Sequence, residues 1–297
     1  MDLIIYSDKN DLTEGMFGQC LTWLLEILYA LEHNNNITEK SKIIFDVNAL
    51  AYDNLIPRYI IPKKIYDRVE LQDAKILNIK GVKSMNKIDF DFHENSFLIA
   101  NKTWNKYFDF STNIKDKIPS FDGTKTLGLH YRGTDKNTDL SQANPMTHEE
   151  VFLIVEDFLN NNTHIENIYC CSDEQQFIDK MIVRFAKYNI IHFTQIRSME
   201  GMKAFFREGQ YVDKILQDEM TIAALVDMIA LSKCDSVLKT SSALSAFSKI
   251  INPKLNLYAI SAMKQRWFPT GLVPKYNSKS NIINQILNRT MYGHVIY

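Results

Sequence analysis

Short apolar runs alternate with longer stretches of helical periodicity through the second half of the chain. Five runs have the length and apolar character of buried strands, at residues 126–130, 168–172, 190–193, 236–239 and 256–260. Between them, residues 147–160, 174–188 and 218–232 have the apolar spacing of helices. Strands and helices that alternate in this way predict a parallel sheet.

The first half of the chain opens with a similar unit. Residues 3–6 are predicted to form a strand, residues 20–32 an apolar helix, and residues 43–47 and 97–100 two further strands. The composition turns polar between residues 111 and 125, where Pro119 and Gly123 interrupt the pattern. We therefore expect an α/β protein of two Rossmann-like domains, residues 1–120 and residues 121–297.

Composition and charge exclude several classes of protein. The 297 residues include 34 basic and 35 acidic side chains, a net charge of -1, whereas a general nucleic-acid binder carries a basic excess. The four cysteines show no CxxC or Cys/His ligand spacing. We therefore expect buried free thiols, with neither a disulfide framework nor a metal site.

The start of the chain does not resemble a secretory leader. No basic region followed by a long apolar run precedes the first strand. The apolar helix predicted at residues 20–32 is about half as long as a bilayer span requires. These features predict a soluble cytoplasmic protein and are compatible with peripheral association with a membrane.

One stretch concentrates groups that bind anions and move protons. The run at residues 126–130 ends in His130, Arg132 and Lys136 within seven residues, with Gly133 among them. Ligands of open α/β sheets bind at the carboxyl ends of the strands. An arginine offers a planar fork of donors suited to a diphosphate, and a nearby lysine adds a point charge. The alternative is a strand that ends in a solvated polar turn.

Other segments offer a comparable setting, each with a structural alternative. Gly15 and Gly18 precede the first helix, where glycines allow close approach of an anion or simply form a tight turn. Asp227 lies within an apolar helix, so its carboxylate needs either a structural partner or a ligand. The remaining candidates are polar residues at strand ends, which can equally cap the following helices: Ser172, Asp173, Thr240, Ser241 and Ser242.

The segment His-Tyr-Arg-Gly-Thr-Asp-Lys at residues 130–136 resembles the His-x-Arg-Arg-Thr-Asp-Lys motif of the α1,6-fucosyltransferases. It is more loosely similar to the His-x-Arg motifs of α1,2- and protein O-fucosyltransferases. The later helix with Asp227 and the Thr-Ser-Ser turn resemble the helix-Asp and Thr-x-Ser-Ser stretches of the same superfamily. Gly133 is a departure, because the family has a second arginine at this position.

The resemblance implies a GT-B fold and an inverting, metal-independent transfer of fucose from GDP-fucose to a hydroxyl of a glycan. It assigns the β-phosphate of the donor to Arg132, with Lys136 close by. It places the other candidates at the donor nucleotide: Gly15, Gly18, His130, Ser172, Asp173, Asp227, Thr240, Ser241 and Ser242. Residues 1–120 are then the acceptor side and residues 121–297 the nucleotide-sugar domain.

The general base is where the sequence fits the family least well. The α1,6 enzymes have a glutamate just after the motif, whereas this chain has Leu140 there and its nearest acid is Asp139. Asp139 is therefore the candidate base, working with Lys136. Two alternatives stay open. One is a glycosyltransferase of the same fold that uses GDP-mannose or a deoxy-sugar derivative. The other is a nucleotide-binding protein without turnover.

Overall fold

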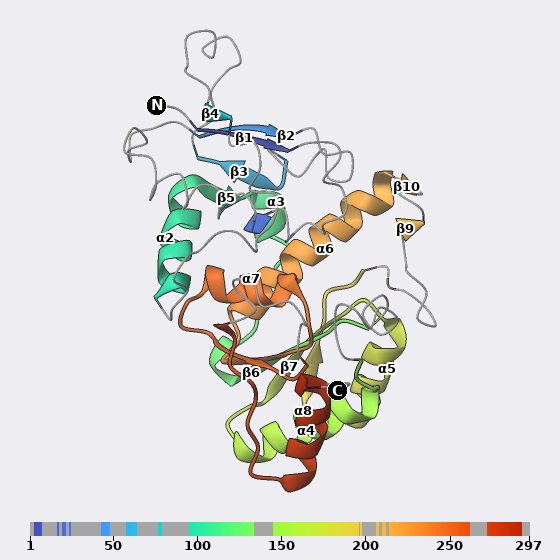
Figure 1. The fold of residues 1–297 in the computed structure, drawn as a ribbon. Helices are drawn as coiled ribbons and strands as arrows, with labels where there is room; N and C mark the ends of the chain where they lie inside the picture. Colours follow the sequence, from blue (N-terminus) through green and yellow to red (C-terminus); the bar gives the residue numbers. More distant parts are fainter. Residues whose placement is uncertain are drawn as a thin grey trace. The chain divides into compact units, whose positions relative to one another are not determined.

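The chain divides into two compact units, Met1–Lys117 and Ile118–Tyr297. A computed structural model (Figure 1) describes residues 3–7, 17, 20, 21, 24, 43–47, 58–63, 77–78, 95–133, 145–195, 197, 206–207, 210–211, 214–261 and 272–292. Four of the predicted site residues lie outside the described residues: Gly15, Gly18, Lys136 and Asp139.

The first unit contains a small parallel sheet. Strands β1 (Leu3–Ser7), β2 (Ile43–Val47) and β4 (Leu77–Asn78) pair in the order β2-β1-β4, which confirms strands predicted at residues 3–6 and 43–47. A separate antiparallel pair joins β3 (Ile60–Pro62) to β5 (Phe108–Phe110). The short helix α3 (Thr112–Lys115) follows β5. Of the helix predicted at residues 20–32, the described residues Cys20, Leu21 and Leu24 are helical and buried, and so is Phe17, which precedes the predicted range.

The strand predicted at residues 97–100 is wrong, because these residues begin helix α2 (Ser96–Tyr107). Phe97, Ala100, Trp104 and Tyr107 are buried at helical spacing, whereas the intervening Leu98 and Ile99 are exposed. A four-residue apolar run is ambiguous between strand and helix, and the longer period decides. The aromatic side chains here are core: Trp104 stacks on Phe108 with ring centroids 4.4 Å apart.

The second unit is built on a five-stranded parallel sheet. Its strands are β6 (Thr126–Tyr131), β7 (Asn167–Ser172), β8 (Asn189–Ile191), β11 (Ser236–Lys239) and β12 (Asn256–Ala259), in the order β12-β11-β6-β7-β8. All four pairings are parallel, as the alternating sequence pattern predicts. The short strands β9 (Phe206–Arg207) and β10 (Gln210–Tyr211) form a separate antiparallel pair.

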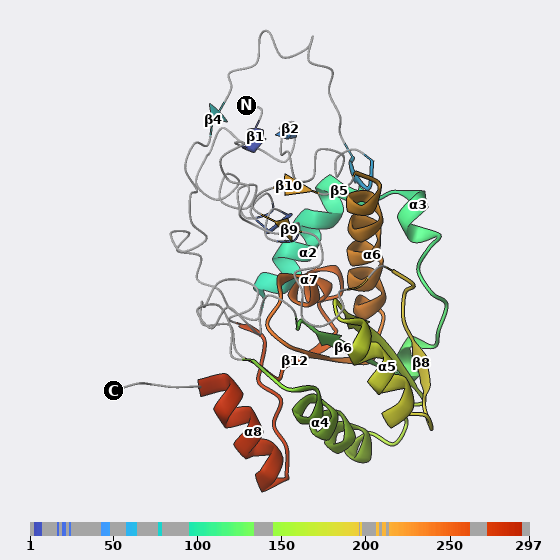
Figure 2. The ribbon, with the colours of Figure 1, turned by 90° about the vertical axis from the view of Figure 1, so that its right-hand side faces the viewer.

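Helices cover both faces of this sheet (Figures 1 and 2). Helices α4 (His148–Asn161), α5 (Gln175–Arg184) and α8 (Asn281–Tyr292) lie on one side, and α6 (Lys214–Ser232) and α7 (Ala243–Ile251) on the other. Side chains of a strand alternate between faces, so Leu127, Leu129 and Tyr131 join the core beneath α4 and α5. Gly128 and His130 therefore face α6 and α7.

Two glycines of the second unit allow close approach. A methyl group at Gly128 would lie 2.7 Å from Val237 Cγ2 and 2.9 Å from Leu231 Cδ2, so this glycine lets α6 pack on β6. A methyl group at Gly123, which begins the 3₁₀ turn η3 (Gly123–Lys125) before β6, would overlap the backbone carbonyl of Lys233.

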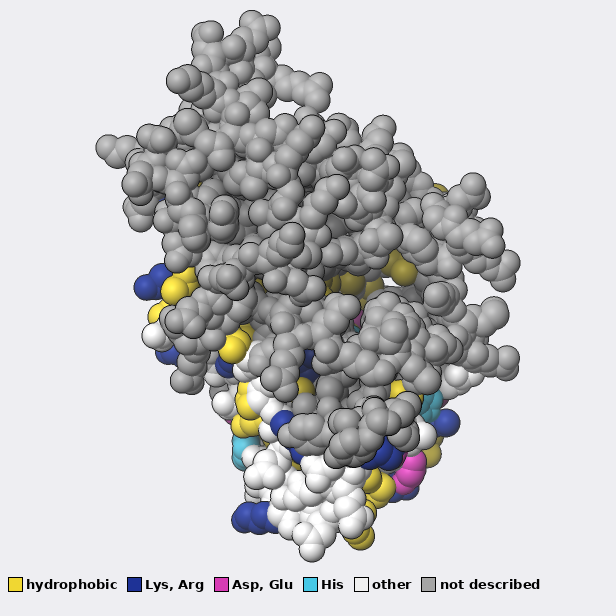
Figure 3. Space-filling view, in the orientation of Figure 1, with side chains coloured by type: hydrophobic (Ala, Val, Ile, Leu, Met, Phe, Trp, Pro, Cys, Tyr) yellow, Lys and Arg dark blue, Asp and Glu magenta, His cyan; other side chains and the backbone are white. Residues whose placement is uncertain are grey.

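On the face of the molecule shown in Figure 3, basic, acidic and uncharged side chains are interspersed over the described part of the surface.

Candidate active site

The order of the strands fixes where a ligand site is expected. From β6 the chain runs outward through β7 to β8, then returns to the opposite side of β6 to form β11 and β12. The carboxyl ends of β6 and β11 therefore flank the topological switch point, where ligands of open α/β sheets bind. Arg132 and Gly133 follow β6, and residues 240–242 follow β11.

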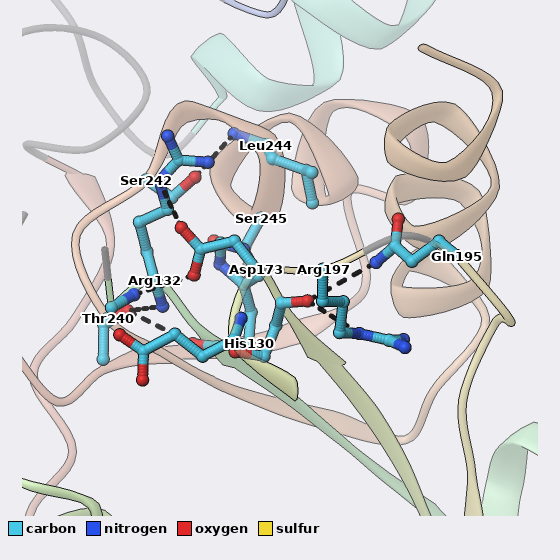
Figure 4. A network of polar contacts seen from close by, with 12 residues as sticks. His130, Arg132, Asp173, Gln195, Arg197, Thr240, Ser242, Leu244 and Ser245 are labelled. Carbon is cyan, nitrogen blue, oxygen red and sulfur yellow. Dashed lines mark hydrogen bonds and ion pairs between the residues drawn. The ribbon is translucent and has the colours of Figure 1, made fainter. Parts of the chain in front are cut away.

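The turns after β6 and β11 are tied together by Thr240 (Figure 4). The Thr240 hydroxyl accepts from the Arg132 backbone N–H at 2.8 Å and lies 3.3 Å from the His130 carbonyl, to which it donates. The Thr240 backbone N–H donates to the same carbonyl at 3.0 Å. Thr240 thus binds both the His130 carbonyl and the Arg132 N–H, which fixes the backbone position from which the Arg132 side chain extends.

Asp173, at the end of β7, orients Arg132. One carboxylate oxygen of Asp173 lies 3.2 Å from Arg132 Nε, and the other accepts from the Gly133 backbone N–H at 2.9 Å. The Arg132 side chain remains 40% exposed, so its outer donors can reach a ligand. Figure 4 shows this pair at the ends of adjacent strands. Asp173 thus acts on Arg132, a contact that the sequence analysis did not assign to it.

His130 is buried beneath α7. Its Nδ1 lies 3.0 Å from the hydroxyl of Ser245, a residue in the first turn of α7. Burial, with the nearby charges of Lys239 and Arg132, lowers the pKa of His130 to about 3. The imidazole is therefore neutral at physiological pH and serves to join β6 to α7.

Ser172 is the last residue of β7 and is occupied by hydrogen bonds within the protein. Its hydroxyl accepts from the Glu174 backbone N–H at 3.1 Å. Its carbonyl accepts from Arg197 Nε at 3.1 Å and from Gln195 Nε2 at 3.4 Å. Ser172 therefore holds the turn before α5 rather than capping that helix, whose N-cap residue is Glu174.

Glu174 fills the space beside Gly133. Its Oε2 lies 2.9 Å from His148 Nε2, and Lys180 Nζ lies 3.3 Å from the other ring nitrogen of His148. The Glu174 side chain is nearly buried, and a methyl group at Gly133 would overlap its carboxyl. The glycine that replaces the second arginine of the α1,6 motif is thus packed against an acidic side chain.

The carboxylate of Asp227 is hydrogen-bonded to side chains of the protein. Its carboxylate accepts from the Tyr169 hydroxyl at 2.7 Å, from Cys171 Sγ at 3.1 Å and from Gln195 Nε2 at 3.2 Å. Burial raises the pKa of Asp227 to about 6, and these hydrogen bonds oppose the rise. Of the two alternatives for this carboxylate, the structure thus supplies the structural partner, which joins α6 to β7.

The three hydroxyls after β11 differ in their surroundings. Thr240 joins β11 to β6 as described above, and the Ser242 hydroxyl caps α7 by accepting from the Leu244 N–H at 3.2 Å. The Ser241 hydroxyl is buried and has no hydrogen-bond partner in the part of the chain that the structure describes. Ser241 is therefore the hydroxyl of this turn that a ligand would satisfy.

Sequence reasoning missed Arg197, Gln195 and the Glu174–His148 pair. Arg197 and Gln195 lie beyond β8, in a stretch without a recognisable motif, and only the folded chain brings them to β7. His148 follows Thr147, which forms a capping box with Glu150, so its position in the sequence indicates only a helix start.

The described residues contain neither a cluster suited to a metal ion nor a helix suited to cross a membrane. No group of three or more His, Cys, Asp or Glu side chains that could hold a metal ion occurs among these residues. No helix in the described ranges is long and apolar enough to cross a membrane. The four cysteines are free and buried, as the sequence predicts.

Comparison with known proteins gives a fold. No protein-family model and no curated protein matches the sequence. Among solved structures, a NodZ α1,6-fucosyltransferase soaked with GDP-fucose matches with a TM-score of 0.52 and 13% identity, over 84% of this chain and 92% of that one. A crystal of NodZ grown with GDP matches at 0.52 and 12% identity, over 85% and 92%. A variant of Arabidopsis thaliana FUT1 in complex with GDP matches at 0.51 and 9% identity, over 93% of this chain and 73% of that one.

These neighbours are all fucosyltransferases, and two of them hold GDP and one was soaked with GDP-fucose. Their likeness to this chain confirms the resemblance and the GT-B fold class predicted from the sequence. The chain therefore has the fold of the fucosyltransferases.

Proposed function

We propose that this protein is a glycosyltransferase that transfers fucose from GDP-fucose to a hydroxyl of a glycan acceptor. The observation that carries the proposal is the Arg132–Asp173 pair at the switch point of a sheet whose fold is that of fucosyltransferases. A guanidinium that extends from a fixed backbone position and has partly exposed donors suits a diphosphate. We propose residues 121–297 as the nucleotide-sugar domain and residues 1–120 as the acceptor domain.

Arg132 would act electrostatically. When the bond between the sugar and the diphosphate breaks, negative charge develops on the leaving phosphate. A guanidinium that is already positioned to donate hydrogen bonds to this phosphate stabilises the developing charge more in the transition state than in the ground state. The backbone bond to Thr240 and the Asp173 carboxylate provide the positioning.

The proposed mechanism is inverting and needs no metal ion, since arginine and lysine side chains neutralise the diphosphate. The acceptor hydroxyl attacks the anomeric carbon from the face opposite the diphosphate and loses its proton to a base. Asp139, with Lys136, remains the proposed base, and Gly15 and Gly18 remain proposed donor contacts; their support is the sequence motif. The free, buried cysteines support a reducing compartment, and we propose that the protein acts in the cytoplasm.

The alternative donor, GDP-mannose or a deoxy-sugar derivative, shares the diphosphate and nucleoside that this site would contact. The packing of Glu174 against Gly133 favours this alternative, because it excludes the second arginine that the α1,6 motif has at this position. Competition between the two GDP-sugars, measured in the same assay, separates the donors.

Release of GDP from GDP-fucose tests the proposal. Purified protein is incubated with GDP-fucose and a mixture of glycan acceptors in the presence of EDTA, and GDP is quantified. We expect release by the native protein and its loss in Arg132→Ala, because the leaving phosphate loses its charge partner. Arg184→Ala, which removes an exposed arginine paired with Glu156 and Glu149, is the matched control and should retain release. Full turnover by Arg132→Ala would refute the assignment.

A further inference from the structure

Lys239 is a buried cation without a described partner. It is the last residue of β11 and pairs in register with His130 of β6. The residue is 2% exposed, yet no hydrogen bond or ion pair joins its ammonium to any residue that the structure describes. Because Leu238 belongs to the core beneath α4, alternation along the strand directs Lys239 toward the face of α6 and α7.

A second unsatisfied group lies two residues further on. The Ser241 hydroxyl is buried without a partner, although the Ser241 N–H donates to Ser261 Oγ at 3.0 Å. Helix α7 then begins at Ala243, and the first N–H groups of a helix point away from its body toward the preceding turn. Cation, hydroxyl and helix N-terminus thus occur together at the carboxyl edge of β11, a combination suited to an anion.

The surrounding charges leave Lys239 without compensation. On the same face, β6 contributes His130 and is followed by Arg132, and β7 contributes Tyr169 and Cys171. Helix α6 contributes Asp227, whose carboxylate accepts hydrogen bonds from those two β7 residues. The first turn of α7 carries no titratable side chain, and Lys249 of its second turn donates to the backbone carbonyls of Pro253 and Leu255. Burial lowers the pKa of Lys239 to about 7. A buried ammonium is costly unless it is paired, and an anionic ligand would supply the pair.

We propose that Lys239 and Ser241 contact the diphosphate of the nucleotide sugar, with Lys239 supplying from β11 the second cation that Gly133 cannot supply after β6. This inference rests on the proposed function and adds a charge that the α1,6 motif does not contain. The two cations, Arg132 and Lys239, then approach the diphosphate from the adjacent strands that border the switch point.

Binding of the donor is then coupled to protonation of Lys239. Above pH 7 the free side chain is mostly neutral, and a bound diphosphate raises its pKa, so that a proton is taken up on binding. Affinity should therefore fall as the pH rises above 7. GDP-fucose is the suitable probe, because its diphosphate has both ends esterified and does not itself take up a proton in this range.

The experiment is calorimetric titration of GDP-fucose at pH 8 in buffers of different ionisation enthalpy. For the native protein we expect uptake of close to one proton. His130 contributes little at this pH, because its pKa of about 3 would have to rise past 8. Lys239→Met should bind about 10- to 100-fold more weakly, the range for a hydrogen bond to a charged group, and should lose the uptake. Lys233→Met removes an exposed lysine and should change neither quantity.

A purely structural role for Lys239 predicts the opposite pattern. Loss of a structural side chain lowers the melting temperature of the free protein and leaves proton uptake unchanged. Loss of a buried amino group that has no described partner in the free protein should raise that melting temperature. Normal affinity in Lys239→Met, or binding by the native protein without proton uptake, would overturn this inference alone. Failure of the native protein to bind GDP-fucose would overturn the proposed function, and with it the proposed contact of Lys239 and Ser241 with the diphosphate.

Discussion

Gly133 and Glu174 should be energetically coupled. A methyl group at Gly133 would overlap the Glu174 carboxyl and lie 2.8 Å from Tyr131 Cε1. A flexible glutamate at the surface would simply turn away. Glu174 is held instead, because its side chain is nearly buried and its Oε2 is 2.9 Å from His148 Nε2. Gly133→Ala must therefore either strain the backbone or break this hydrogen bond.

The expected loss of stability follows from the free-energy cost of overpacking and from that of breaking the hydrogen bond. Overpacking a filled site costs about 1–3 kcal/mol, and loss of a buried hydrogen bond to a charged group costs about 1.5–3 kcal/mol. Since the variant incurs one of these two costs, we expect Gly133→Ala to lower the free energy of unfolding by about 1.5–3 kcal/mol. In a Glu174→Ala background only the Tyr131 contact remains, so the same change should cost roughly 1 kcal/mol or less.

A double-mutant cycle measures the coupling. The free energy of unfolding is determined by urea denaturation for the native protein, Gly133→Ala, Glu174→Ala and the double variant. We expect a coupling energy of about 2 kcal/mol. In the matched control, Glu156→Ala removes an exposed glutamate and should leave the cost of Gly133→Ala unchanged. Equal costs of Gly133→Ala with and without Glu174 would refute the packing argument.

Two further predictions concern stability. The pKa of Asp227 is raised by burial from 3.8 to about 6, so between these values the native state holds more protons than the unfolded state. Stability should therefore fall by about 2 kcal/mol as the pH rises from 4 to 6, and Asp227→Asn should remove this slope; parallel denaturation profiles for the two proteins would contradict this. Gly123→Ala should destabilise the protein by more than Gly128→Ala, because it meets the rigid backbone carbonyl of Lys233 rather than side chains. Thermal melts of the two variants decide, and equal losses would count against the close approach.

The sheet of the second unit could be predicted from the sequence because its strands are apolar on both faces. A buried parallel strand such as β6 gives a continuous apolar run that ends at its polar turn. The start of α2 could not be predicted, because Leu98 and Ile99 are exposed apolar residues that fill the gaps of a helical pattern. A single short window does not separate these cases.

The candidate site was only partly predictable for a different reason. Arg132 and Asp173 could be placed at one edge, because parallel strands end on the same side of a sheet. The particular partners of each side chain depend on contacts across the fold. Asp227 is satisfied by Tyr169, 58 positions away, and Glu174 by His148, 26 positions away. No local pattern carries that information.

The carboxyl edge around Arg132 is proposed to bind the diphosphate of GDP-fucose. This binding is measured by isothermal titration of the native protein and of Arg132→Ala with GDP-fucose in the presence of EDTA, with the UDP-sugar UDP-glucose as comparison. We expect the native protein to bind GDP-fucose and not UDP-glucose, and Arg132→Ala to bind about 10- to 100-fold more weakly, as the loss of a hydrogen-bonded charge requires. Equal affinity in Arg132→Ala, or a response to UDP-glucose alone, would contradict the proposal.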